Sequence, residues 1–271
     1  MKIRKIQDTR QNITFIWALT RMKLSKLMVF RLSFFGTFFV DGSLFLVQLL
    51  LYHAIYSQVD SIGGWSTGEM IIFIGTFSLI NALNMMIFFF GINDIPNKIK
   101  NGDLDHYLTK PVNPLLRLTF ESVDPGSLPL AIGSILLILY GVKQLEVRVT
   151  LPRFAVYFIF VLLMTLLWYD LQLLVRTIPF FTISANNIAR MGDTFLELCM
   201  KIPGNLFRGI YKILFYFIVP YGIMATFPTE LIAGNLTFPQ LAYGCFITVL
   251  FTAITLWFWR LGLRHYKSAS S

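Results

Sequence analysis

The sequence has few of the residues that cover the surface of a soluble domain. Charged residues make up only 14% of the 271 residues and hydrophobic residues 56%, whereas about a quarter and about half are usual in soluble proteins. The mean hydropathy is +0.66. These proportions exclude an ordinary soluble protein and leave little of the chain for a separate soluble domain.

The sequence also lacks the motifs of common enzyme classes. It contains no G-x-x-x-x-G-K-[ST] phosphate loop, no H-E-x-x-H and no G-x-S-x-G, so it has no such site for ATP, zinc or an acyl group. Two cysteines and three dispersed histidines are too few for a metal site. We therefore expect no catalytic residue and no bound metal or cofactor. Any ATP hydrolysis would need a separate subunit.

Long apolar runs dominate what is present. Six of them approach the roughly 20 residues that a helix needs to cross a bilayer. They cover about 32–55, 70–92, 128–142, 154–175, 210–227 and 241–259. The pattern predicts an all-α membrane protein with six transmembrane helices in a single domain over residues 1–271. Asp124-Pro-Gly-Ser predicts a turn or helix start before the third run, and Pro220 a kink in the fifth.

Lys and Arg lie almost wholly in alternate gaps between these runs. All but three of the 23 are before the first run, after the last, in the second and fourth gaps or, for Lys212, at the start of the fifth run; the exceptions are Lys143, Arg148 and Arg153. Because cytoplasmic loops retain Lys and Arg, we predict a multi-pass protein of the cell (plasma) membrane with both termini cytoplasmic. The net charge of +9 follows this topology, which favours membrane lipid over nucleic acid as its partner.

The segments that flank the six-helix bundle, taken as 32–259, have their own patterns. In the N-terminal segment, 1–31, apolar residues recur at three- and four-residue steps among basic ones over 11–30, which predicts an amphipathic helix in the membrane interface. The C-terminal segment, 260–271, is predicted to be a cytoplasmic tail.

Two connecting segments are more than plain loops. The fourth gap, 176–209, has an amphipathic pattern over 183–198 that predicts a cytoplasmic or interfacial helix. The segment 228–238 is either a plain turn or a short helix that re-enters the membrane, and its apolar residues favour the helix.

The second gap, 95–114, is dense in turn and capping signals. Pro96 suits the first turn of a short helix and Gly102 its C-terminal end. Asp103 is placed to cap the next turn. Lys110-Pro111 and Asn113-Pro114 favour extended backbone. Because a plain connector needs none of these signals, we predict a compact polar element joined directly to two membrane helices.

Two motifs resemble those of a known family. The run Ile99-Lys-Asn-Gly-Asp-Leu-Asp-His-Tyr-Leu-Thr-Lys-Pro resembles the I-x-x-G-x-L-D-x-x-L-x-K-P signature of ABC-2 family permeases, the membrane subunits of ABC transporters. The tail Gly262-Leu-Arg-His-Tyr-Lys-Ser-Ala-Ser-Ser is similar to the G-L-R-x-Y-x-S-A ending of those permeases.

The resemblance implies half of a type-2 ABC exporter of the bacterial inner membrane, in which the second gap is a cytoplasmic coupling helix. The implied partners are cytosolic ABC ATPase subunits, which bind ATP and Mg, and a second permease, identical or related, that completes a dimer. The implied ATPase contacts are Asn101, Gly102, Asp103, Leu104, Asp105, His106 and Tyr107.

Few polar residues lie inside the apolar runs, and such residues are often functional in membrane proteins. The candidates for a pathway or packing role are Asp41, Asn81 and Asn84. Asp41 either faces the path or the partner permease, or pairs with one of the two asparagines. Asp170 is expected to hydrogen-bond to a polar neighbour. The leading hypothesis is an exporter permease; the alternative is an ion- or proton-coupled secondary transporter, whose usual internal repeat we do not find.

Overall fold

The computed structural model describes residues 61–110, 112–145, 149–182 and 202–266, with scattered positions between 21 and 58. Within these ranges the regular structure is helical, apart from an isolated bridge between Ile62 and Trp65. The predicted interfacial helix at 11–30, most of the first apolar run with Asp41, and the amphipathic segment 183–198 lie outside the described residues.

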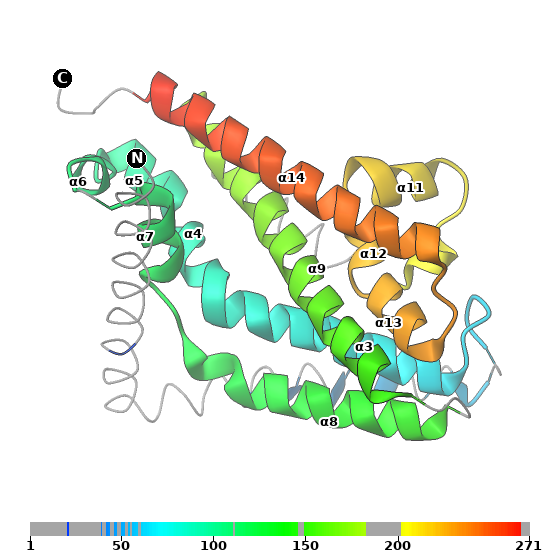
Figure 1. Ribbon diagram of the computed structural model, residues 1–271. Coiled ribbons are helices and arrows are strands. Elements are labelled where there is room, and N and C mark those ends of the chain that lie inside the picture. The colour runs from blue at the N-terminus through cyan, green and yellow to red at the C-terminus, as the bar shows by residue number, and fades with distance from the viewer. Residues whose placement is uncertain are drawn as a thin grey trace.

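Three helical segments of the described chain are long and apolar enough to cross a membrane: 67–101, 151–180 and 238–265. They comprise α3 (Thr67–Asn84), the π-helix η1 (Met85–Phe89), α4 (Phe90–Asn93) and α5 (Ile95–Asn101); α9 (Leu151–Thr177) with the 3₁₀ turn η3 (Ile178–Phe180); and α14 (Phe238–His265). The shorter apolar helix α8 (Leu128–Gln144) runs alongside α3 (Figure 1). These helices confirm that four of the six apolar runs are helical.

Helix α3 begins and packs for reasons visible in the sequence. Ser66 and Glu69 form a reciprocal capping box, in which the Ser66 N–H donates to Glu69 Oε2 at 2.8 Å. Glycines then bring α3 and α8 close together. A Cβ at Gly75 would lie 2.7 Å from Ile138 Cγ1, and one at Gly141 would lie 2.7 Å from Ile72 Cγ1.

The predicted turn before α8 is confirmed. The Gly126 N–H donates to Asp124 Oδ1 at 2.9 Å, and a 3₁₀ turn, η2 (Pro125–Ser127), leads directly into the helix. The segment predicted as the C-terminal tail, 260–271, begins as a continuation of a helix. Helix α14 continues past residue 260 to His265.

The bundle has two ends that differ in structure (Figure 1). One end, called the α5–α7 end below, carries α5, α6 (Asp105–Leu108) and α7 (Pro114–Phe120), together with the last turns of α9 and α14. The opposite end holds the turn at 61–66, the end of α8 and the first turns of α9 and α14.

The fifth apolar run, predicted as a kinked crossing at 210–227, consists of two helical parts. Its first part is α11 (Ile210–Ile213) with the π-helix η5 (Leu214–Ile218), and its second is α12 (Tyr221–Met224) with α13 (Thr226–Ala233). The two parts meet at a 74° bend. The bend includes Pro220, which confirms the predicted kink. The helix at 226–233 also agrees with the helix favoured for 228–238.

Both ends of this bent pair lie at the opposite end of the bundle. The Asn205 Nδ2 donates to the Gly63 carbonyl at 2.8 Å, and the Asn235 Nδ2 donates to Glu69 Oε1 at 2.8 Å. Gly63 and Glu69 belong to the turn and first helical turn of α3. The chain therefore enters and leaves the pair 210–233 on the same side, as a helical return.

This return corrects the prediction for the fourth gap, 176–209. Phe180 packs against Trp259 at the α5–α7 end, whereas the Gly204 N–H donates to Thr226 at the opposite end. Phe180 and Gly204 thus lie at different ends of the bundle. Arg208 therefore belongs to the end opposite Lys98, and its assignment to the same side as Lys98 is wrong. Apolar length alone does not distinguish a crossing from a return.

Cysteine labelling in sealed vesicles provides a test of this arrangement. In a cysteine-free background, Ser61→Cys and Arg208→Cys should react with an impermeant maleimide from the same face, and Asn101→Cys from the other, because all three positions are exposed at the stated ends. Reaction of Arg208→Cys together with Asn101→Cys would instead restore the predicted fourth-gap topology.

Candidate functional site

The α5–α7 end is built from the predicted capping signals. Pro96 lies in the first turn of α5, and Gly102 ends the helix in the left-handed conformation with φ 80° and ψ 1°, as a C-terminal glycine does. The Asn113 side chain caps α7 by accepting from the Leu115 N–H at 3.0 Å. Asp103, in contrast, does not cap α6, whose first turn has no side-chain cap.

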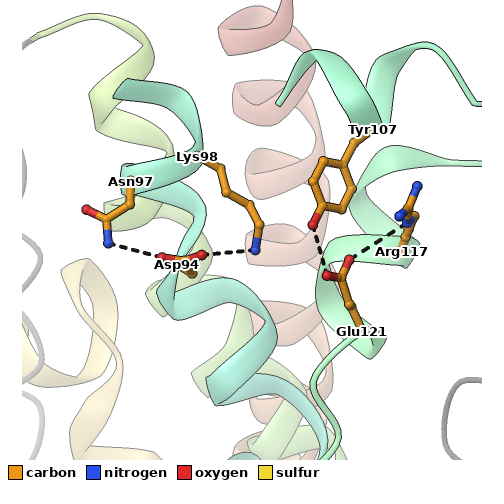
Figure 2. A network of polar contacts seen from close by, with 6 residues as sticks. All are labelled: Asp94, Asn97, Lys98, Tyr107, Arg117 and Glu121. Carbon is orange, nitrogen blue, oxygen red and sulfur yellow. Dashed lines mark hydrogen bonds and ion pairs between the residues drawn. The ribbon is translucent and has the colours of Figure 1, made fainter. Parts of the chain in front are cut away.

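A polar network connects these short helices, with Tyr107 at its centre (Figure 2). The Tyr107 hydroxyl donates to Glu121 Oε1 at 2.9 Å. The Lys98 ammonium lies 5.5 Å and the Arg117 guanidinium carbon 4.6 Å from the centroid of the Tyr107 ring. Cation–π contacts of this kind contribute about 0.5–1 kcal/mol each at exposed sites. Tyr107 thus links α5, α6 and the end of α7.

Ion pairs extend the network at both sides of Tyr107. Asp94 Oδ2 lies 3.1 Å from Lys98 Nζ, and Asp94 Oδ1 accepts from Asn97 Nδ2 at 3.0 Å. Arg117 Nε lies 3.7 Å from Glu121 Oε2. Partly exposed pairs of this kind are weak individually, so their main effect is to orient the two cations toward the Tyr107 ring.

Tyr107 remains a hydrogen-bond donor at neutral pH. Its burial, and then its hydrogen bond to Glu121, raise the pKa of Tyr107 above the usual value for a tyrosine. The hydroxyl is therefore protonated over the physiological range.

A close backbone approach holds α7 against α4. A Cβ added at Gly91 would overlap the carbonyl oxygens of Leu118 and Thr119. Only glycine permits this approach. Neither this role of Gly91 nor α7 was predicted from the sequence, because a glycine inside an apolar run has no local signal that distinguishes a helix contact from a neutral position.

The two motifs that carry the family resemblance meet at this end. Tyr266, from the C-terminal motif, packs against the hydrophobic cluster that includes Leu104 and Tyr107, and its ring lies 5.9 Å from that of Phe180. Burial, and then the nearby Asp105 carboxylate, raise the pKa of Tyr266. The first motif and the last turn of α14 therefore form one structural unit.

The seven predicted contact residues divide into two groups. Leu104 and Tyr107 are buried and hold the short helices together. Asn101, Asp103 and His106 are exposed, while Gly102 and Asp105 are partly buried. The surface available to a partner therefore combines Asn101, Asp103 and His106 with part of Gly102 and Asp105.

The polar residues inside the long helices have mixed environments. Asp170 accepts a hydrogen bond from Thr252 of α14, which confirms the expected polar neighbour. The Arg176 Nη2 donates to Asn93 Oδ1 at 3.1 Å and so ties α9 to α4. Asn81 is partly buried and Asn84 fully buried. No pairing of either with Asp41 is described, because Asp41 lies outside the described residues.

These helices and their connections define a helical membrane protein. The family model of ABC-2 family transporter proteins matches residues 43–270. The chain belongs to this family, as its two motifs indicate. No curated protein and no solved structure matches it.

Proposed function

We propose that this chain is the permease subunit of an ATP-driven ABC exporter, with the α5–α7 end docking a separate ATPase subunit. The observation that carries the proposal is how the short helices at this end are connected to the long helices of the bundle. The exposed surface of Asn101, Asp103 and His106 lies on an element that is continuous with α3 through α4 and packed on the ends of α9 and α14. A push on this surface would therefore act on three long helices.

In this proposal, the chain forms the translocation path, and the partner ATPase subunit binds and hydrolyses ATP. ATP and Mg bind to the ATPase subunit, and its closure moves the α5–α7 end as a unit, because the Tyr107 network and the Gly91 contact resist internal bending. A second permease, identical or related, completes the path between two protomers. Movement of the two ends then switches the path from inward to outward access.

The division of labour is directly testable. The purified chain in detergent or nanodiscs should hydrolyse ATP no faster than an empty control, because its sequence has no phosphate loop. Addition of the proposed soluble ATPase subunit should produce turnover above that of the ATPase alone. Robust hydrolysis by the isolated chain would refute the proposal, as would an ATPase whose rate and retention on the immobilised chain do not change.

A further inference from the structure

Helix α14 exposes one continuous stripe along its length. In its most apolar stretch only 28% of the residues are buried, against 61% in each of the segments 67–101 and 151–180. Because an α-helix turns by about 100° per residue, residues at alternating steps of four and three stay within about 40° of one line along the helix. The exposed residues that follow this line, called the α14 stripe below, are Phe246, Leu250, Ala253, Trp257, Arg260 and Arg264.

The α14 stripe changes from apolar to cationic as the helix approaches the α5–α7 end (Figure 1). Phe246 and Trp257 are each 62% exposed and lie about 16 Å apart along the helix axis. This length matches one leaflet, which is half of the roughly 30 Å hydrocarbon core of a bilayer. Trp257 then lies where tryptophan is enriched, at the boundary with the headgroups, and the two arginines lie at headgroup level.

The two arginines are suited to bind a phosphate together. Arg260 and Arg264 are exposed, and side chains four residues apart on a helix are neighbours on its surface. Among the residues that the structure describes, neither arginine has an ion pair or a hydrogen bond from its side chain. A guanidinium group binds phosphate oxygens through parallel N–H donors, which adds geometric specificity to the charge attraction.

The same charges disfavour a second copy of the chain as the occupant of the α14 stripe. Two copies with the same orientation in the membrane are related by a two-fold axis along its normal, so a stripe that packs on itself meets identical residues at the same depth. Arg260 and Arg264 would then face the arginines of the copy, and like charges that face one another across an interface are costly. An anionic occupant removes this conflict.

We propose that the α14 stripe binds one anionic phospholipid from the leaflet at the α5–α7 end. The phosphate lies between Arg260 and Arg264, and an acyl chain runs along the apolar part of the stripe toward Phe246. A zwitterionic phospholipid presents the same phosphate but carries its own cation, which competes with the two arginines. The site therefore selects net negative charge in the headgroup, and it does not depend on the proposed ATPase contact.

Photocrosslinking in nanodiscs of mixed composition tests the site. The nanodiscs contain equal amounts of phosphatidylglycerol, which is anionic, and phosphatidylcholine, which is zwitterionic, with the same acyl chains. In the full chain with Ala253→p-benzoylphenylalanine, intact-mass spectrometry should find phosphatidylglycerol attached several-fold more often than phosphatidylcholine. The matched position is Ile159, 58% exposed on α9, a helix that carries no pair of exposed cations. There the two lipids should attach about equally.

Two double variants separate a defined site from general surface charge. Arg260→Gln with Arg264→Gln should equalise the two lipids at position 253, and Arg264→Gln alone should lower the preference to an intermediate value. Lys100→Gln with Lys110→Gln removes the same charge from exposed positions at the same end and should keep the preference. Because all four side chains are exposed, both double variants should elute as the parent does in size-exclusion chromatography.

Three results would overturn the proposal. Equal attachment of the two lipids at position 253 of the parent would show that the stripe does not select charge. Equal loss of the preference in both double variants would show that overall charge alone concentrates the lipid. A covalent dimer of the chain as the main product at position 253 would assign the stripe to a contact between two permeases.

Discussion

Gly91→Ala is expected to detach α7 from α4 and to destabilise the α5–α7 end by about 3 kcal/mol, the upper part of the usual range for overpacking. The added Cβ would overlap two backbone carbonyl oxygens, those of Leu118 and Thr119. Backbone atoms cannot be moved by a rotamer change, so the two helices must separate. The Asp94, Lys98 and Tyr107 contacts depend on that spacing.

Thermal unfolding of the purified protein, followed by size-exclusion chromatography, measures the effect. The matched control is Gly133→Ala, also in a helix, where a Cβ would meet nothing within 4 Å. The control should be unchanged or more stable, since alanine is favoured over glycine in helices by about 1 kcal/mol. Equal melting temperatures for the two variants would show that the close approach of α4 and α7 is not required.

Gly102→Val should leave the membrane helices folded and abolish productive contact with the ATPase. Gly102 ends α5 with φ 80°, where a β-branched residue is strained by roughly 1 kcal/mol or more. The strain is relieved by moving the turn between α5 and α6, which carries Asp103 and leads to His106. We therefore expect normal expression and loss of ATPase co-purification or of chain-stimulated ATP hydrolysis.

Gly64→Val is a suitable control for backbone strain. Gly64 has φ 84° and open space around its Cβ position, but it lies in the turn at the opposite end of the bundle. It should carry a similar strain and retain ATPase binding. If Gly102→Val assembles and transports at the parental rate, residues 95–110 are a plain connector and the docking proposal fails. If both variants lose the ATPase equally, the loss is due to general destabilisation.

Local signals in the sequence predicted most of the individual helices. Pro96 and Gly102 mark the start and end of α5, and the apolar runs mark α3, α8, α9 and α14 within a few residues. Such predictions succeed because a helix is defined by contacts within a few residues of the same segment, which periodicity and capping residues report. The two motifs likewise identified the family.

Contacts between distant segments could not be derived in this way. Tyr107 was predicted as a partner contact, but its ring is buried between Lys98 and Arg117. The structural roles of Gly91 and Tyr266 depend on contacts with residues of other helices. No local pattern reports which side chain or carbonyl from another helix approaches a given position.

The sequence by itself determined that this is a helical membrane protein of the ABC-2 family, because hydropathy and two short motifs are properties of consecutive residues. Only the tertiary structure decided that the apolar run at 210–227 returns to the end where it started, through Asn205 and Asn235. A crossing and a return bury similar apolar surface, so hydropathy does not separate them. A crossing and a return differ only in which residues are contacted by the segments directly before and after the run.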